Sequence, residues 1–504
     1  MELYLKTNNT ASAIAIADIP VVEYVKLYND LKERMKEERY HVAHYFATEI
    51  ENGLRFYLIL LDDESSSVLI TSFIPDYYAE GLASLTALHP SFHPFEREIH
   101  ELYGVPFDSH PWLKPLRFSF DRRDKQSTMD SYPFYTIDGD ELHEVNVGPI
   151  HAGIIEPGAF RFICNGEQVL HLEIALGYQH RGVESEMLRN QNRLRQTLIT
   201  ESIAGDTAVG HATAYAELSE KLADITIDSN LHKERFVALE LERIAMHIAD
   251  TGALATDIGF QLYQVACEAL RTVTINTSQA WCGNRFGKSM IRPFGTNHPL
   301  TEEKIATIRK NVAEVRRRYN EVREDILESQ TLLARFEQCG LVPKSEMVSI
   351  GGVGMAARSS SLLRDIRKTH PWGLYATEVN HEPVLKSDGD VMSRLATRLD
   401  EVLQSADYIE SVLANYKPSA AMPTPNYEAQ FKPNALSFSL VEGWRGEICH
   451  VALTDEQGNI AKYKIKDPSL HNWLGLAIAV RSEGISDFPI NNKSFNLSYC
   501  GHDL

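Results

Sequence analysis

Residues 301–338 read TEEKIATIRKNVAEVRRRYNEVREDILESQTLLARFEQ, and this stretch predicts one long amphipathic helix. Thr301 is a typical N-terminal capping residue, acidic side chains follow it in the first turn, and Cys339-Gly340 ends the pattern. Apolar residues then recur at alternating spacings of three and four, which places them along one helical face. They are Ile305, Ile308, Val312, Val315, Tyr319, Val322 and Ile326.

A second helix of the same kind is predicted from about Val391 to Leu413. Two long amphipathic helices suit the core of a helical bundle. The region 143–504 is therefore expected to be mainly helical, with β elements at its two ends. The apolar face of the second helix is formed by Leu395, Leu399, Val402, Ala406 and Ile409.

The N-terminal residues 1–120 have a different pattern and predict a small α/β domain. The β-rich runs 40–46 and 55–61 are separated by Glu51-Asn52-Gly53, a turn signal, and 67–74 is a third candidate strand. Residues 121–142 are polar and predict a linker between the two domains. The whole chain is thus expected to be an α+β protein, with a small α/β domain before a larger, mainly helical one.

Composition excludes several classes of function. The chain has 504 residues, with 50 Lys+Arg against 69 Asp+Glu and a formal net charge of −19, which argues against nucleic-acid binding and against adhesion to anionic lipid by charge. Only 6 cysteines in 504 residues exclude a disulfide scaffold, and because no two of them form a CxxC pair, a local cysteine metal knuckle is excluded too. No apolar run approaches the ~20 residues of a membrane span, and no signal peptide is visible, so we expect a cytoplasmic protein.

Residues 95–113 read FEREIHELYGVPFDSHPWL and resemble the signature of the C-type subunits of complex I, E-R-E-x-x-D-x-[FY]-G-[IV]-x-F-x-G-H-P-x-L. Two positions depart from it. His100 or Glu101 stands at the usual acidic position, and Ser109 replaces a glycine. In that family this domain is a scaffold without a cofactor, and the resemblance implies the same here.

The second domain resembles the D-type subunits of complex I and, even more, the large subunit of membrane-bound [NiFe]-hydrogenases, of the formate hydrogenlyase or hydrogenase-4 type. The resemblance begins with NVGPIHAGIIEPGAFRF at 146–162 and LGYQHRGVE at 176–184. It implies their shared fold, with a long helical bundle and terminal β elements. Further matches are ALELERIAMH at 238–247, ATDIG at 255–259, NRFG at 284–287, EGWRGE at 442–447 and YKIKDPS at 463–469.

The resemblance also implies a metal site that this chain cannot build. The [NiFe] large subunits bind nickel and iron through two CxxC motifs, because soft thiolates are the ligands that these metals need. The matching positions here are Ala204 and Thr207 in the first motif, and Ser498 and Gly501 in the second. Cys500 falls between ligand positions, so no Ni–Fe centre is expected.

The quinone site of the D-type family is incomplete as well. Its tyrosine falls at about Gly205, and its histidine lies near Glu156-Pro157, so both are replaced. Glu156 resembles the hydrogenase glutamate that relays protons, and a carboxyl in a closed cavity can pass protons near neutral pH. His151, Asp257 and Arg445 are expected to line the same cavity. The alternative is that Glu156 and His151 only satisfy buried backbone groups or Arg445.

Three other motifs are weaker. Gly351-Gly352-Val353-Gly354 lacks the third glycine of a dinucleotide site, so nucleotide binding is not favoured. The acids and the histidine within 201–211 could bind a hard metal, but Ala204 and Gly205 interrupt them. The histidine-rich segment 89–100 could also bind a metal, but its two prolines prevent a clean helical ligand pair, so packing is favoured.

We therefore expect the large subunit of a membrane-associated, complex I-related oxidoreductase complex, with electrons arriving from a partner subunit. The resemblance implies a small iron–sulfur subunit with a 4Fe–4S cluster, complex I-like integral membrane subunits and a possible ferredoxin-like subunit. Attachment would be peripheral, on the cytoplasmic side of the plasma membrane. This chain would bind no cofactor of its own, although a quinone is possible. The alternatives are a purely structural protein that couples two arms of the complex and an authentic C/D fusion of NADH-quinone oxidoreductase.

Overall fold

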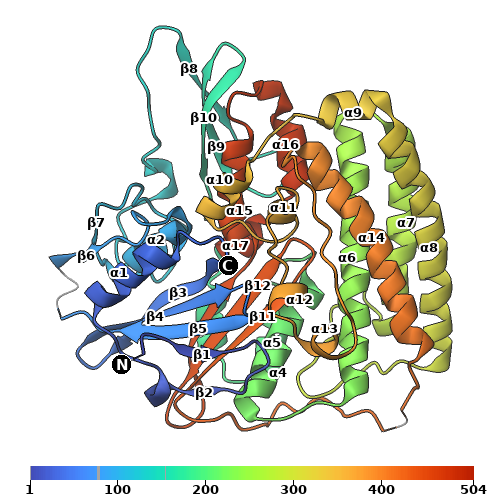
Figure 1. The fold of residues 1–504 in the computed structure, drawn as a ribbon, viewed down its shortest axis with the longest axis horizontal. Coiled ribbons are helices and arrows are strands. Elements are labelled where there is room, and N and C mark those ends of the chain that lie inside the picture. Colours follow the sequence, from blue (N-terminus) through green and yellow to red (C-terminus); the bar gives the residue numbers. More distant parts are fainter. Residues whose placement is uncertain (1, 77–79, 154, 420) are drawn as a thin grey trace.

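The computed structural model describes residues 2–76, 80–153, 155–419 and 421–504. An antiparallel sheet of order β1-β5-β4-β3 forms the N-terminal part (Figure 1). The predicted hairpin and third strand are confirmed, because β3 and β4 pair from Tyr40↔Asp62 to Ile50↔Gly53 and β5 pairs with β4. Its elements are β1 Leu5–Thr7, α1 Tyr24–Arg34, β3 Tyr40–Ile50, β4 Gly53–Asp62, β5 Ser67–Phe73, β6 Leu82–Ala83, α2 His93–Tyr103 and β7 Phe107–Asp108.

The two faces of this sheet are buried against different partners. One face packs against α1 and α2 through side chains such as Leu31, Tyr45 and Phe95. The other face, with Phe46 and Ile59, joins the large apolar core of the second half of the chain. Because both faces are covered, the strands are almost continuously apolar.

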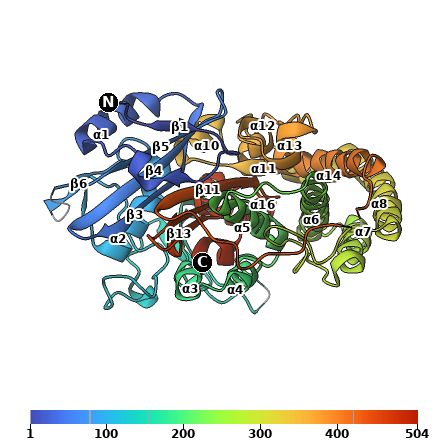
Figure 2. The same ribbon diagram turned by 90° about the horizontal axis from the view of Figure 1, so that it is seen from below.

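A helical bundle forms the opposite end of the molecule (Figure 2). The helix predicted over 391–413 is confirmed as α14. The prediction of one helix over 301–338 is wrong at its C-terminal end, because the extended backbone of Ser329 separates α8 from α9. An unbroken helix would continue the apolar face of α8 at residue 333, and the break buries Leu332 and Phe336 instead. The bundle consists of α6 Ser229–Asp257, α7 Gln261–Cys282, α8 Glu302–Glu328, α9 Gln330–Phe336 and α14 Val391–Ala414.

A second sheet of order β13-β12-β11-β2 lies between the bundle and the N-terminal sheet. Its edge strand β2 comes from the N-terminus, where Ile14 pairs with Leu436. Helix α5 packs against its strands β11 and β12. These elements are β2 Ile14–Ala15, α5 Ala208–Ala223, β11 Ala435–Glu442, β12 Glu447–Thr454 and β13 Ile460–Lys466.

A third sheet of order β10-β9-β8 follows the predicted linker and packs against the C-terminal helices. The α+β organisation expected from the sequence is confirmed. In the part of the chain that the structure describes, no helix is both long and apolar enough to cross a membrane. The remaining strands and helices are β8 Leu142–Val147, β9 Ala159–Asn165, β10 Gln168–Ala175, α3 Val183–Arg189, α4 Arg193–Thr200, α10 Lys344–Ile350, α11 Gly354–Arg358, α12 Ile366–Thr369, α13 Gly373–Thr377, α15 Ser469–Ala479, α16 Phe488–Phe495 and α17 Tyr499–Asp503.

Candidate functional site

Arg181 holds together two loops that are almost 300 residues apart in the sequence. Its Nη1 atom donates to the carbonyl of Ser202 at 2.5 Å. Its Nη2 atom donates to the carbonyls of Ile203 at 2.8 Å and of Cys500 at 3.1 Å. The loop after α4 and the C-terminal loop therefore meet, as the family resemblance implies for the two cysteine motifs.

Arg445 occupies the centre of this junction. It lies in the turn between β11 and β12, and its guanidinium makes two 2.7 Å bonds to the carboxylate of Asp206. Its Nε atom donates to the carbonyl of Asn496 at 2.5 Å, and its Cζ atom lies 3.9 Å from the centre of the Trp444 ring. Burial raises the pKa of Asp206, but the charge and bonds of Arg445 outweigh it, so the pKa is below its ordinary value.

The glycine-rich segment 351–354 positions this turn and has no role that requires a nucleotide. Gly354 adopts φ +67°, and a Cβ atom there would lie 2.1 Å from the carbonyl oxygen of Arg445. Only glycine therefore permits the backbone of 353–354 to lie directly against the turn that carries Arg445.

The four positions predicted to have lost cysteines lie on these two loops, and their surroundings do not suit a Ni–Fe centre. Ala204 is buried and offers no donor atom. The hydroxyl of Thr207 accepts from Trp444 Nε1 at 3.2 Å and contacts Asp206. The hydroxyl of Ser498 accepts from the backbone N–H of Gly501 at 2.9 Å. An alanine, a glycine and two hydroxyls in place of four thiolates are the wrong donor set for soft metals.

Gly501 itself has no room for a side chain. A Cβ atom there would lie 2.7 Å from the Cγ atom of Asp467, whose carboxylate is fixed at 3.1 Å from His211 Nε2. We expect Gly501→Ala to lower the free energy of unfolding by about 1–3 kcal/mol through overpacking. Gly205→Ala is the matched control, because no atom lies within 4 Å of its added Cβ. Equal denaturation midpoints for the two variants would contradict this description.

Glu156 lies beside Cys500, the one cysteine of this loop. The Sγ atom of Cys500 lies 3.4 Å from the hydroxyl of Ser498. Burial, followed by the charge of Glu156, raises the pKa of the Cys500 thiol to about 11. The thiol is therefore protonated near neutral pH, and the hydroxyl of Ser498 or the side chain of Glu156 can accept from it.

Only part of the predicted cavity set comes together. Glu156 and Arg445 lie on either side of the C-terminal loop, since Glu156 contacts Cys500 and Arg445 contacts Asn496. The imidazole of His151 instead bonds the carbonyl of Gly158 in its own loop at 2.9 Å. Asp257 is exposed at the C-terminal end of α6, and the structure gives it no hydrogen bond to the other three. Whether these four residues line one cavity stays a prediction, since among them only Glu156 and Arg445 lie next to the C-terminal segment 496–500.

Two buried acids of α6 that sequence reasoning missed lie close to the junction. Asp250 accepts from Asn496 Nδ2 at 2.6 Å and from Arg398 Nε at 2.9 Å. Glu242 accepts from the backbone N–H groups of Val209 and Gly210, at 2.8 and 3.1 Å, in the first turn of α5. Burial raises the pKa of Glu242 to about 8 despite these bonds. The available signal was the presence of charged residues within the otherwise apolar run 236–250.

A hydrogen-bonded chain of four buried side chains begins at Asp467 and ends at Tyr463. His211 bonds Asp467 at 3.1 Å through Nε2 and His450 at 3.0 Å through Nδ1. His450 then bonds the hydroxyl of Tyr463 at 2.8 Å. Such a continuous chain of donors and acceptors can pass a proton without water. The sequence allows a different use of His211, in a metal cluster with nearby acids, but its partners are His450 of β12 and Asp467, which directly follows β13.

The histidine-rich segment 89–100 is used for packing. His89 bonds the hydroxyl of Ser91 at 2.7 Å, His93 stacks on Trp112 and His100 bonds the carbonyl of Val105 at 2.8 Å. Within the described ranges, no group of three or more His, Cys, Asp or Glu side chains is arranged to hold a metal ion.

Two family models match the chain. The model of the 30 kDa subunit of respiratory-chain NADH dehydrogenase matches residues 6–125, and that of its 49 kDa subunit matches residues 257–435. Most residues of the junction lie outside both ranges, including Glu156, Asp206, Arg445 and Cys500. The loops that diverge from the family's metal and quinone sites are thus outside the segments that the models match.

Similar proteins come from two kinds of complex. Hydrogenase-4 component G of Escherichia coli (strain K12) is 24% identical over 463 residues, which cover 88% of this chain and 80% of the relative. Formate hydrogenlyase subunit 5 of the same organism is 24% identical over 482 residues, 91% of this chain and 81% of the relative. The C/D fusion of NADH-quinone oxidoreductase from Phocaeicola vulgatus is 23% identical over 406 residues, 74% of this chain and 76% of the relative. The chain therefore contains one domain similar to the 30 kDa subunit and one similar to the 49 kDa subunit of respiratory-chain NADH dehydrogenase, and its relatives are components of hydrogenase and NADH-quinone oxidoreductase complexes.

Proposed function

We propose that this chain is the large subunit of a membrane-associated, complex I-related oxidoreductase complex that works without a Ni–Fe centre. It couples electron transfer from a partner iron–sulfur subunit to quinone reduction or to proton transfer. The names of the relatives support the type of complex, since they are hydrogenase components and NADH-quinone oxidoreductase subunits.

The ion pair between Arg445 and Asp206 is the observation that carries the proposal. It lies where the two loops meet, and its two 2.7 Å bonds form a closed guanidinium–carboxylate pair at the place that the family resemblance assigns to a metal. This pair offers no soft thiolate ligand, which nickel and iron need. Glu156, near Cys500, is the group that remains for proton exchange.

The proposed partners follow from the same relatives. A small subunit with a 4Fe–4S cluster would deliver electrons, and complex I-like integral membrane subunits would hold this chain peripherally on the cytoplasmic side. A ferredoxin-like subunit would complete the electron path. The net charge of −19 supports attachment through proteins, since anionic lipid would repel the chain.

Glu156→Gln in the intact complex tests the proton role. We expect proton translocation per electron, or turnover, to fall by about tenfold or more, because the amide cannot exchange a proton. Glu167→Gln is the matched control, since Glu167 is exposed in the turn between β9 and β10. Unchanged coupling in Glu156→Gln would favour the purely structural role. Nickel at about one atom per chain in the purified complex would contradict the proposal itself.

A further inference from the structure

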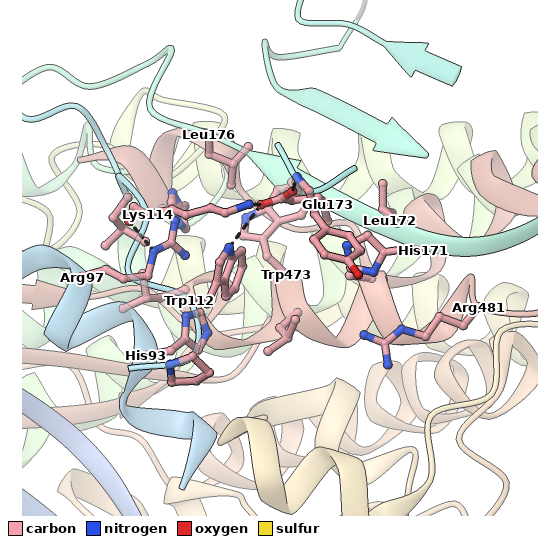
Figure 3. A pocket seen from close by; sticks show the side chains of 18 residues that line it. His93, Arg97, Trp112, Lys114, His171, Leu172, Glu173, Leu176, Trp473 and Arg481 are labelled. Atoms are coloured by element: carbon pink, nitrogen blue, oxygen red, sulfur yellow. Dashed lines mark hydrogen bonds and ion pairs between the residues drawn. The ribbon is translucent and has the colours of Figure 1, made fainter. Parts of the chain in front are cut away.

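A cavity of about 330 Å³ lies outside the Arg445 junction, between the N-terminal domain and the C-terminal helices. Its walls come from α2, the segment 111–116, β10 and α15 (Figure 3). The volume falls at the lower end of the range for small-molecule sites, roughly 300–1,000 Å³. The cavity is therefore large enough for a small organic ligand and too small for a folded partner.

The lining of this cavity is positively charged, although the whole chain has a net charge of −19. Arg97, Lys114 and Arg481 line it, and Glu173 is the one carboxylate among its lining residues. Glu173 is neutralised by Lys114 at 2.6 Å. Within the described residues, Arg97 and Arg481 have no carboxylate partner, although the guanidinium of Arg97 also donates to the carbonyls of Lys114 at 2.8 Å and Pro115 at 2.5 Å. Their two charges make the cavity complementary to an anion.

Aromatic and aliphatic side chains form the rest of the wall. The ring of Trp112 is stacked 5.2 Å from that of His93, and the guanidinium carbon of Arg97 lies 4.3 Å from the Trp112 ring centre. Trp473 and Leu474 of α15 contribute apolar surface from the C-terminal part. Figure 3 shows Trp112 near the centre of the lining side chains, with Arg481 extending from the α15 side. Flat apolar surfaces of this kind favour a flat, aromatic ligand.

Two lining residues carry buried nitrogen atoms without a partner among the described residues. They are Trp473, through Nε1, and His93, through Nδ1 and Nε2. Both side chains are almost fully buried, at 4% and 5% exposure. A buried N–H group without an acceptor costs about 1–3 kcal/mol. These nitrogen atoms are almost inaccessible, so an oxygen atom of a ligand would stabilise this wall once the side chain rotates toward the cavity.

We propose that this cavity binds a small amphipathic organic anion, with a flat aromatic body between the apolar walls and a carboxylate directed to Arg481 and Arg97. Such a ligand would contact both domains, because its walls come from α2 on one side and from β10 and α15 on the other. It would therefore also stabilise the junction of the domains against heat. The proposal does not depend on the junction at Arg445, so either can fail without the other.

A pair of ligands of equal shape tests the charge requirement. We expect 2-naphthoate to bind the full chain saturably in isothermal titration calorimetry, and the uncharged 2-naphthamide to bind about tenfold more weakly. Arg481→Ala should lower the affinity for 2-naphthoate by about fivefold and leave the affinity for 2-naphthamide unchanged. Arg318→Ala on α8 is the control, since this exposed arginine pairs only with Glu314 of the same helix.

A second variant tests the unpartnered nitrogen. Trp473→Phe keeps an aromatic wall but removes the N–H group, and it should weaken 2-naphthoate by about threefold or more. Its melting temperature without ligand, compared with that of the wild type, shows that the fold is kept. Any one of three results would overturn the proposal. The first is equal affinity of the wild type and Arg481→Ala for 2-naphthoate, the second is equal affinity of the wild type for the acid and the amide, and the third is the absence of saturable binding.

Discussion

Replacing Arg358 with methionine is expected to lower the free energy of unfolding by about 3–5 kcal/mol, or to prevent folding altogether. Arg358 lies at the end of α11, and its guanidinium bonds Glu401 at 2.7 Å and Glu442 at 2.6 Å. Asp365 lies 3.4 Å away, and all four side chains are fully buried. Removing the cation therefore leaves carboxylates in the protein interior with too few positive charges.

The size of the effect follows from the number of elements that meet at this cluster. Glu401 belongs to α14 and also accepts from Arg367 of α12 at 3.0 Å and from His247 of α6 at 2.8 Å. Glu442 ends β11, so the cluster connects the bundle to the central sheet. Burial and the nearby Asp365 raise the pKa of Glu442 to about 7. The positive charges of the cluster therefore do not outweigh the burial of Glu442 and its repulsion by Asp365.

Chemical denaturation of Arg358→Met and Arg316→Ala compares a buried with an exposed ion pair. Arg316 joins α8 to Asp407 of α14 at 2.6 Å, but both side chains are about half exposed, at 45% and 57%. We expect Arg316→Ala to cost less than about 1 kcal/mol. Arg358→Met combined with Glu442→Gln should be more stable than Arg358→Met alone, because the second change removes an unpaired carboxylate. A small effect of Arg358→Met, similar to that of Arg316→Ala, would contradict this view of the cluster.

The fold could be predicted from the sequence where local patterns decide it. The hairpin of β3 and β4 and the helix α14 follow from apolar periodicity and a turn signal, and the structure confirms them. The break at Ser329 could not be predicted, since no glycine or proline marks it and only tertiary packing of Leu332 favours it. The pairing of Ile14 with Leu436 likewise depends on a contact across more than 400 residues.

The candidate site could be predicted only in outline. Family resemblance placed Glu156 and Arg445 near the two diverged loops, and both contact the C-terminal loop. Asp257 was selected on α6, whereas Asp250, two turns earlier on that helix, makes the buried contacts. Sequence patterns show which face of a helix is apolar, but not which acid on it finds an arginine from a distant helix. Ion pairs of this kind become visible only with the tertiary structure.

Glu242→Gln is expected to change how stability depends on pH. Because burial raises the pKa of Glu242 to about 8, the folded chain keeps this proton between roughly pH 4.3, where an unfolded glutamate titrates, and pH 8. The unfolded chain releases it in the same window, so the folded state binds more protons there. The free energy of unfolding therefore falls as the pH rises, by about 1.4 kcal/mol per pH unit from this group.

Glutamine resembles the protonated acid and cannot titrate. The variant therefore does not lose stability through this group as the pH rises. We expect the stability of Glu242→Gln relative to the wild type to increase from pH 5 to pH 8 and then to level off, with a total change of about 4 kcal/mol. Melting temperatures of both proteins across this range measure it, and Glu321→Gln on the exposed face of α8 is the control. A difference between Glu242→Gln and wild type that is constant with pH would mean that the Glu242 carboxylate is already ionised in the folded protein. In that case the N–H groups of Val209 and Gly210 would stabilise the charge more strongly than burial opposes it.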